Sequence, residues 1–256
     1  MRAAYERLTS ILSDPDECGM SALDCIYEIM ENEVQRRDSN ALARRLKEAK
    51  ICLPNARPDT IDFSIERGLD KNKIDALLTM RWMEEHQNII ITGAAGCGKA
   101  FLACALVNQA CIKGRTARVV RVPLLLNQMA ASHQIVETYF KKLKEMKTID
   151  LLVLDDWGIG QLDARSRQDL LEIINERYIY ASTIVTSVLP VNKWSEYIND
   201  TTYSDAILDR LVSVSHRVEL NGASVRQMKE YGAVLKEQPE RNIRLWFIRP
   251  LSTDLL

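Results

Sequence analysis

Short apolar runs alternate with longer amphipathic stretches over most of the chain. Four of these runs are rich in apolar or β-branched residues and have the length of strands: 88–91, 116–123, 151–156 and 182–187. In the third, Leu151 to Leu154 contains no polar residue, which is typical of a strand covered on both faces in a parallel sheet. Helices are expected before and between the strands, at about 71–85, 99–113, 124–147 and 164–178. This alternation predicts an α/β fold in which a parallel sheet lies between helices.

The first fifth of the chain has a different pattern. Residues 1–52 are predicted to be helical, because Gly19 is their only glycine and Pro15 their only proline. The helical pattern stops where Pro54 and Pro58 bracket a polar stretch. We therefore expect three parts, which are a small helical domain, an α/β domain and a C-terminal tail. Their expected bounds are 1–55, 56–230 and 231–256.

Composition and charge restrict the class of protein. The 256 residues are 46% apolar and 27% charged, which is ordinary for a soluble globular chain. The net charge of −1 provides no overall basic field, so any contact with nucleic acid must come from local patches. The sequence has no run of about 18 apolar residues that could span a membrane, and its charged N-terminus lacks a signal-peptide core. We expect a cytoplasmic protein that does not act at a membrane.

The six cysteines do not follow a zinc-binding pattern, because none belongs to a CxxC pair. Cys97, Cys104 and Cys111 recur every seven residues along one expected helix, so we expect them to face the core. Reduced, buried thiols of this kind are common in cytoplasmic proteins.

The strongest chemical signal is a phosphate-binding loop between an expected strand and an expected helix. Residues 93–99 fit the pattern GxxxxGK, in which glycines let backbone N–H groups curl around a phosphate and Lys99 reaches its outer oxygens. The start of the following helix adds positive potential. The residues expected to bind ATP are Gly93, Ala94, Ala95, Gly96, Cys97, Gly98, Lys99, Ala100 and Phe101. The alternative is a glycine-rich turn that binds no nucleotide.

Ala100 departs from the usual form of this motif. A Ser or Thr hydroxyl normally stands there and binds Mg²⁺, which an alanine side chain cannot do. A water molecule could take the vacant ligand position. The departure weakens the case for ATP hydrolysis more than the case for ATP binding.

Two carboxylates follow the third expected strand. Asp155 and Asp156 end an apolar strand, and the carboxyl edge of an open α/β sheet is where ligands bind. We expect Asp155 to hold Mg²⁺, directly or through water, and Asp156 to orient the attacking water. The alternative is that the pair only caps the turn that follows.

Three further residues are candidates for sensing the γ-phosphate. Thr186 ends the fourth expected strand, although a hydroxyl there could equally cap a helix. Arg210 and Arg226 carry the planar, permanently charged guanidinium group that suits a phosphate. A surface arginine without a function is the alternative for both.

Five segments, taken in order, resemble the IstB helper ATPases of bacterial insertion sequences: GAAGCGKAFLACAL, LLVLDDWG, STIVTSVLPVNKW, DAILDRLV and HRVELNGASVR. The segments ENEVQRRDSNALARRLKEAK and ERGLDK, before the phosphate loop, are also similar. Together they cover about residues 1–226. IstB proteins are relatives of the helicase loader DnaC and the initiator DnaA.

The resemblance implies an AAA+ P-loop core over 56–230 with an N-terminal DNA-binding or assembly domain over 1–55. It implies ATP and Mg²⁺ as cofactors, a homo-oligomer assembled by ATP and DNA, and delivery of duplex target DNA to a partner transposase. It also implies that Arg210 is an arginine finger acting in trans on a neighbour's nucleotide. Arg226 would be a sensor II residue acting in cis.

The sequence differs from the family pattern at three places besides its short N-terminus. These are Ala100, Val188 at a position that is usually polar, and an atypical tail. Two alternatives to a transposition helper therefore stay open. One is a DnaC-like loader of a replicative helicase, and the other is a catalytically weak, ATP-binding DNA scaffold.

A basic stretch near the end of the N-terminal region is the expected DNA contact. Its residues are Arg36, Arg37, Arg44, Arg45, Lys47 and Lys50. On a helix, all of these except Arg45 fall within an arc of about 140°, with Leu42, Leu46 and Ala49 on the other side. A second candidate is the lysine cluster at Lys141, Lys142, Lys144 and Lys147. Phosphate contacts would give little sequence preference, and a merely solvated charged face is the alternative.

Overall fold

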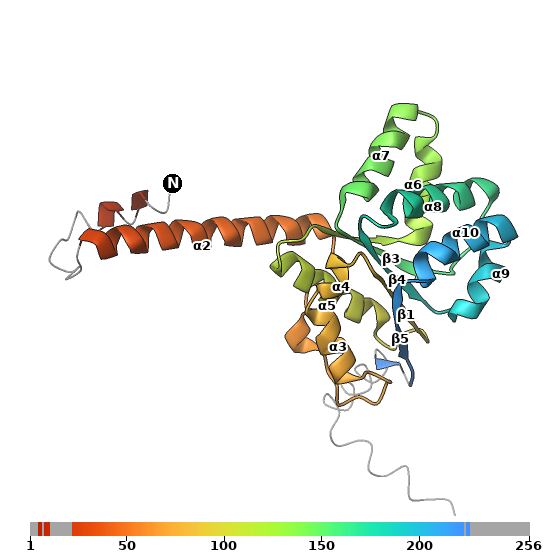
Figure 1. Cartoon of the computed structure of the whole chain (residues 1–256), viewed down its shortest axis with the longest axis horizontal. Helices are drawn as coiled ribbons and strands as arrows, with labels where there is room; N and C mark the ends of the chain where they lie inside the picture. Colours follow the sequence, from red (N-terminus) through yellow and green to blue (C-terminus); the bar gives the residue numbers. More distant parts are fainter. Residues whose placement is uncertain (1–4, 7, 11–21, 223, 226–256) are drawn as a thin grey trace, which may run out of the picture.

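A five-stranded parallel sheet forms the centre of the molecule in the computed structural model, which describes residues 5–6, 8–10, 22–222 and 224–225 (Figure 1). The strands are β1 (Asn88–Gly93), β2 (Ala117–Arg121), β3 (Leu151–Trp157), β4 (Ser182–Ser187) and β5 (Ser215–Leu220). Their order across the sheet is β2-β3-β4-β1-β5, and each neighbouring pair is parallel. The predicted α/β class is therefore confirmed.

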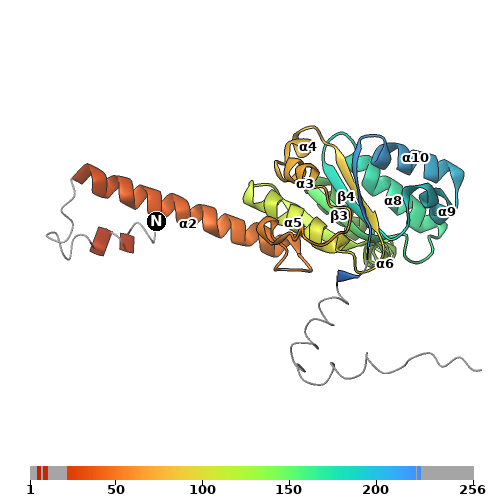
Figure 2. The same ribbon diagram turned by 90° about the horizontal axis from the view of Figure 1, so that it is seen from below.

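Helices cover both faces of the sheet (Figures 1 and 2). One layer contains α3 (Lys71–Leu78), α4 (Arg81–Glu84) and α5 (Lys99–Ile112). The other contains α6 (Val122–Ser132), α7 (Val136–Thr148), α8 (Ala164–Arg177), α9 (Trp194–Ile198) and α10 (Thr201–Val212). Short 3-10 turns lie at Pro58–Thr60 (η1) and Val191–Lys193 (η2). Among the described residues, no helix combines the length and the apolar character that crossing a bilayer requires.

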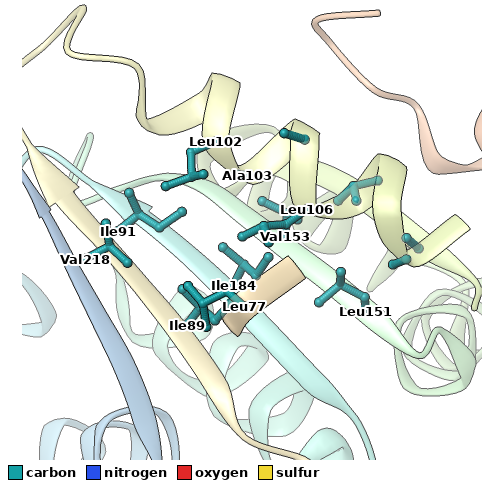
Figure 3. Packing of buried hydrophobic residues seen from close by; sticks show 14 of the residues in the cluster. Leu77, Ile89, Ile91, Leu102, Ala103, Leu106, Leu151, Val153, Ile184 and Val218 are labelled. Carbon is teal, nitrogen blue, oxygen red and sulfur yellow. The ribbon is translucent and has the colours of Figure 1, made fainter. Parts of the chain in front are cut away.

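The alternation of side chains along each strand divides the core into two halves. Ile89 and Ile91 point toward α5, whereas Ile90 packs with the helices of the opposite layer. Figure 3 shows Leu102 and Leu106 of α5 lying over the first half. Because both faces of the sheet are buried, the first four positions of β3 and the middle positions of β1 and β4 are apolar, whereas β4 also buries serines and threonines at its two ends.

A long helix, α2 (Ala22–Ala49), extends away from the layered body (Figure 2). Its last turns pack against α5 and β2. Ala49 is fully buried there, and Leu42 and Leu46 pack beside it, so the predicted inward face is confirmed. The final turns of α2 thus share the core of the α/β body, although they precede the boundary expected from Pro54 and Pro58. The predicted tail at 231–256 lies outside the described residues.

Some predicted helices are divided. The stretch 71–85 forms α3 and α4, separated by Met80 with a left-handed φ of 66°. The stretch 124–147 forms parts of α6 and α7, although no glycine or proline marks the break between them. The strand β5 was not predicted, because it lies at the sheet edge and buries only Val218 and Leu220 among polar neighbours.

Candidate nucleotide site

A cavity of about 700 Å³ opens at the carboxyl edge of the sheet. It brings together the phosphate loop after β1, the end of β2 and the end of β3, together with residues from the segment that follows α2. The predicted site residues that line the cavity are Ala95, Gly96, Gly98, Lys99, Ala100, Phe101, Asp155 and Asp156. The two strongest sequence motifs thus meet at one site.

The phosphate loop leads directly into α5, as the motif requires. Gly98 has a φ of +103°, and a Cβ built on it would lie 2.5 Å from Arg67 Nη1. The positive φ favours glycine at this position. Cys97 is fully buried beneath the loop, and it precedes α5 rather than lying on it as predicted.

Lys99 lies at the first position of α5. Its ammonium donates to the carbonyl oxygens of Gly93 at 2.7 Å and Ala94 at 2.8 Å. Both acceptors belong to the loop itself, so the charge is held over the place where a phosphate would bind. A phosphate oxygen would be a stronger acceptor than either carbonyl, because a charge-assisted bond forms between two ions.

The two carboxylates of β3 lie at a bulge. Leu154 pairs with Val185 and Trp157 pairs with Ser187, so Asp155 and Asp156 together stand opposite Thr186. The Thr186 hydroxyl donates to Asp155 Oδ1, and the Asp156 N–H donates to the same hydroxyl at 3.3 Å. Asp156 has a left-handed φ of 62°. An ordinary strand would point these two side chains to opposite faces, whereas here both line the cavity.

Arg121, at the end of β2, is a site residue that the sequence analysis missed. Its Nε lies 2.7 Å from Asp156 Oδ2. The hydrogen bond that Arg121 donates to Asp156 raises the pKa of Arg121, and the charge of the same carboxylate adds to the effect. Register explains the contact, because β2 and β3 are parallel neighbours and Arg121 pairs with Asp155.

The stretch from the end of η1 to Arg67 supplies another wall that was not predicted to bind. Thr60, Asp62, Ile65 and Arg67 all line the cavity. Arg67 is 5% exposed and donates to the carbonyl oxygens of Asp62 at 2.9 Å and Cys97 at 3.4 Å. It therefore ties this segment to the phosphate loop. The segment ERGLDK contains Arg67, but its pattern alone does not indicate a contact.

Two of the three departures that the resemblance implied also face the cavity. Ala100 lines it from the first turn of α5, and Val188 lines it from the end of β4 with 42% exposure. Thr186, two residues earlier, is 1% exposed and is bonded to Asp155. In this structure Thr186 thus contacts a carboxylate rather than opening onto the cavity.

The phosphate loop and the paired carboxylates at one cavity are common to many ATPases, and comparison with known proteins decides between them. The profile of the IstB-like ATP binding protein family matches residues 1–233. The chain belongs to this family.

Relatives of known sequence agree with that assignment. A putative insertion sequence ATP-binding protein of Sinorhizobium fredii is 39% identical over 219 residues, which are 86% of this chain and 89% of the relative. A putative ATP-binding protein in an insertion sequence of Mycobacterium tuberculosis is 29% identical over 211 residues, 82% of this chain and 83% of the relative. As a member of the IstB-like family, the protein is an ATP-binding ATPase.

Solved structures place the fold of this IstB-like protein among the AAA+ P-loop domains. DnaI matches with a TM-score of 0.55 and 20% identity over 67% of this chain and 96% of that protein. The AMPPCP-bound DnaA of Aquifex aeolicus also has a TM-score of 0.55, with 21% identity over 72% of this chain and 56% of that protein. At these identities the likeness concerns the fold alone.

Arg210 lies at the opposite edge of the sheet from the cavity. The Asn88 side chain, at the start of β1, donates to the Arg210 carbonyl oxygen at 3.0 Å. The Arg210 guanidinium lies 5.6 Å from the centre of the Tyr178 ring, and its Nη1 donates to the Ala206 carbonyl oxygen at 2.7 Å. The structure therefore does not place Arg210 in the chain's own nucleotide site. Arg226 lies outside the described residues.

The predicted DNA-binding residues are spread along the final turns of α2 and beyond. Arg36 and Arg37 both form ion pairs with Glu33, at 3.5 and 3.0 Å. Arg45 is half-buried, and its Nη1 donates to the Cys111 carbonyl oxygen at 3.5 Å, so it faces the α/β body.

The remaining predicted contacts are more accessible. Arg44 and Lys47 are exposed on α2, and Arg44 lies 4.0 Å from Glu48. The prediction that Lys50 continues the helix is wrong, because α2 ends at Ala49 and Lys50 has a left-handed φ of 51°. The second lysine cluster lies on α7, where Lys147 forms an ion pair with Glu176 of α8.

Proposed function

We propose that this protein is an ATP-dependent helper of transposition that assembles on duplex target DNA and delivers that DNA to a partner transposase. The observation that carries the proposal is the meeting of the phosphate loop and the β3 carboxylates at one large cavity in a chain of the IstB-like family. Its relatives in Sinorhizobium fredii and Mycobacterium tuberculosis are putative insertion sequence ATP-binding proteins, which supports the link to transposition.

In this proposal, the cavity residues divide the work of ATP hydrolysis. Lys99 and the N–H groups at the start of α5 bind the phosphates, and Asp156 orients the attacking water. Asp155 would hold Mg²⁺, because one of its oxygens accepts the Thr186 hydroxyl and the other is left for a ligand. Bound Mg²⁺ neutralises charge that develops on the transferred phosphoryl group. Thr186 acts on this step by positioning Asp155.

The proposed assembly is head-to-tail. The cavity opens at the carboxyl edge of the sheet, whereas Arg210 lies at the amino edge beside Tyr178 and Asn88. One subunit's Arg210 can serve a neighbour's ATP only if unlike faces of the two subunits meet. Such heterologous contacts generate rings or helical filaments, both of which can enclose or follow a DNA duplex.

The proposed DNA contact is the exposed basic side of α2. Arg37, Arg44 and Lys47 are exposed on a helix that extends from the body, so a duplex can approach them. Arg36 and Arg37 share Glu33, which lowers the net positive charge near their end of the site. Contacts to phosphates alone give binding with little sequence preference.

Binding to duplex DNA at increasing salt tests the proposed contact. The test variant reverses four charges, which are Arg36, Arg37, Arg44 and Lys47. The control variant reverses four exposed charges elsewhere, which are Arg81, Arg165, Lys193 and Arg217. We expect weaker binding and a flatter dependence on salt only in the test variant, because fewer counterions are released. Equal salt slopes in the two variants would show that α2 does not contact DNA.

The helper role itself is tested by electron microscopy and by strand transfer. With ATP and duplex DNA, we expect ordered oligomers on the DNA. We also expect the partner transposase to join the ends of the insertion-sequence DNA to the bound duplex. Assembly on DNA without any stimulation of the transposase would contradict the proposed delivery. Co-purification with a replicative helicase instead would favour a DnaC-like loader.

Ala100 favours a second candidate function, a DNA scaffold that binds ATP but turns it over very slowly. Ala100 lines the cavity where a metal-binding hydroxyl normally stands. Phosphate release with saturating ATP, Mg²⁺ and DNA separates the two functions. Turnover that DNA does not stimulate, together with intact ATP binding, would favour the scaffold.

A further inference from the structure

Two cysteines that are far apart in the sequence meet at the wall of the nucleotide cavity. Cys52 Sγ and Cys104 Sγ lie 3.5 Å apart. Cys52 belongs to the segment between α2 and η1, is exposed and lines the cavity. Cys104 belongs to α5 and is 1% exposed. One thiol of the pair is thus accessible from the cavity, and the other lies directly behind it.

The two thiols are chemically unequal. The hydrogen bond with Cys104 lowers the pKa of Cys52 to about 7, although burial and the charges of Asp155 and Asp156 act in the opposite direction. The same hydrogen bond, followed by burial, raises the pKa of Cys104. Cys52 is therefore the thiol that reacts first with an incoming group, since the thiolate is the nucleophile.

The position of the pair connects it to the nucleotide. Cys104 lies one helical turn after Ala100 on α5, whose first turn follows the phosphate loop. Cys52 and its neighbour Leu53 both line the cavity. Because α5 is packed into the core along most of its length, a bond between the sulfurs must move the Cys52 segment rather than the helix. A disulfide also needs the sulfurs at about 2 Å, closer than they now lie.

We propose that Cys52 is a thiol-modification site on the wall of the nucleotide cavity, that Cys104 is its resolving partner, and that oxidation of this pair opposes ATP binding. The reagent is a low-molecular-weight disulfide such as glutathione disulfide. The inference rests on the ATP site and is independent of the role in transposition.

The reaction takes two exchange steps. The Cys52 thiolate attacks one sulfur of the reagent, which forms a mixed disulfide at Cys52 and releases one glutathione as its thiolate. Cys104 then loses its proton to solvent and attacks the Cys52 sulfur, which releases the second glutathione. The product is a Cys52–Cys104 disulfide, so the protein loses two electrons and two protons, and the reagent becomes two thiols. A reducing cytosol would reverse these steps.

The other described cysteines are poorly suited to this reaction. Cys97 and Cys111 are fully buried, and burial raises the pKa of Cys111 to about 11. Cys25 lies near the start of α2, the helix that extends away from the α/β body. Cys25→Ser is therefore a suitable control, because it removes a thiol without changing the pair.

Peptide mapping and ATP titration of the full chain test the proposal. The protein is incubated with glutathione disulfide, its remaining thiols are alkylated, and the linked peptides are identified by mass spectrometry. We expect a Cys52–Cys104 link in wild type and Cys25→Ser, formed more slowly when saturating ATP is present. We expect about tenfold weaker ATP binding after oxidation, within the usual range of coupling between two ligands.

Variants of the pair make the test specific. Each is compared with itself under reducing conditions, so a change in its basal affinity does not matter. Cys52→Ser should show no effect of oxidant on ATP affinity, whereas Cys104→Ala should stop at a glutathione adduct on Cys52. Cys104→Ala is chosen because Cys104 is buried, and thermal unfolding checks that the variant is folded.

Three results would overturn the inference. They are a link that joins other cysteines, an ATP affinity that is equal in the oxidised and reduced wild type, and a rate of modification that ATP does not change. If the reduced wild type binds no ATP at all, the assignment of the nucleotide site is wrong. This failure differs from the three above, because it is visible before any oxidant is added.

Discussion

Arg121 Nε donates to Asp156 Oδ2 across 2.7 Å, so an arginine at the end of β2 holds the carboxylate that we propose as the activator of water. The Arg121 side chain is 64% exposed and that of Asp156 is 30% exposed. Solvent, a nucleotide or DNA can therefore compete for either partner, and a pair this exposed is easily separated. The contact occupies one oxygen of Asp156.

This relationship leads to a prediction for Arg121→Ala. Asp156 should be released, so ATP turnover without DNA should rise about threefold to tenfold and the further stimulation by DNA should shrink. The measurement is steady-state phosphate release with and without duplex DNA. Arg118→Ala is the matched control, because it removes another ion pair from β2, with Glu145 at 2.7 Å, outside the cavity. Unchanged turnover in Arg121→Ala would show that the pair does not restrain Asp156.

A second prediction concerns Lys99. Lys99→Ala should abolish ATP binding, because it removes the cation that the loop holds over the phosphate position. Lys113→Ala, at the other end of α5, should bind ATP like wild type and serves as the control. Titration with a fluorescent ATP analogue gives both affinities, and thermal unfolding confirms that each variant is folded. Equal affinity in the two variants would refute the phosphate-loop assignment.

Ala100 gives a third prediction. Ala100→Thr supplies the hydroxyl that the motif normally provides, so turnover with DNA should rise about tenfold, which corresponds to about 1.4 kcal/mol of barrier. Ala100→Val has nearly the same shape without the hydroxyl and should not be faster than wild type. Phosphate release at saturating ATP and Mg²⁺ compares the three proteins. An equal gain in turnover in Ala100→Thr and Ala100→Val would mean that packing, not metal binding, limits the site.

If Ala100→Thr is no faster than wild type, the hydroxyl is not what the site lacks. Val188 is then the next residue to change, because it lines the same cavity and its apolar side chain cannot form a hydrogen bond there.

The fourth prediction concerns action between subunits. Arg210→Ala should leave ATP binding nearly intact and should remove ATP-driven oligomers and turnover, because Arg210 lies away from its own cavity. Arg217→Ala, on the exposed edge strand β5, is the control and should assemble normally.

Mixing variants tests the direction of this action. A mixture of Arg210→Ala and Asp156→Asn subunits should recover part of the activity, because some interfaces join an intact Asp156 site to an intact Arg210. Co-assembly of the two proteins is checked by differential tags. Proven co-assembly without recovery at any mixing ratio would argue against Arg210 acting in trans.

The sequence by itself determined the class of fold and the two motifs at the centre of the site. The apolar run from Leu151 to Leu154 indicated a strand covered on both faces of a parallel sheet, and the β-branched run at 182–187 indicated a second strand. Lys99 and Asp155 could be placed together, since each follows a strand and the carboxyl ends of parallel strands share one edge.

Only the tertiary structure decided which distant residues complete the site. The strand order places Thr186 of β4 between β1 and β3, and the bulge in β3 brings both Asp155 and Asp156 to the cavity. Arg67 and Arg121 reach the cavity from other segments. Local periodicity specifies whether a segment is a helix or a strand and which face is buried. It does not specify the order and register of the strands, which arise from packing among residues far apart in the chain and decide these contacts.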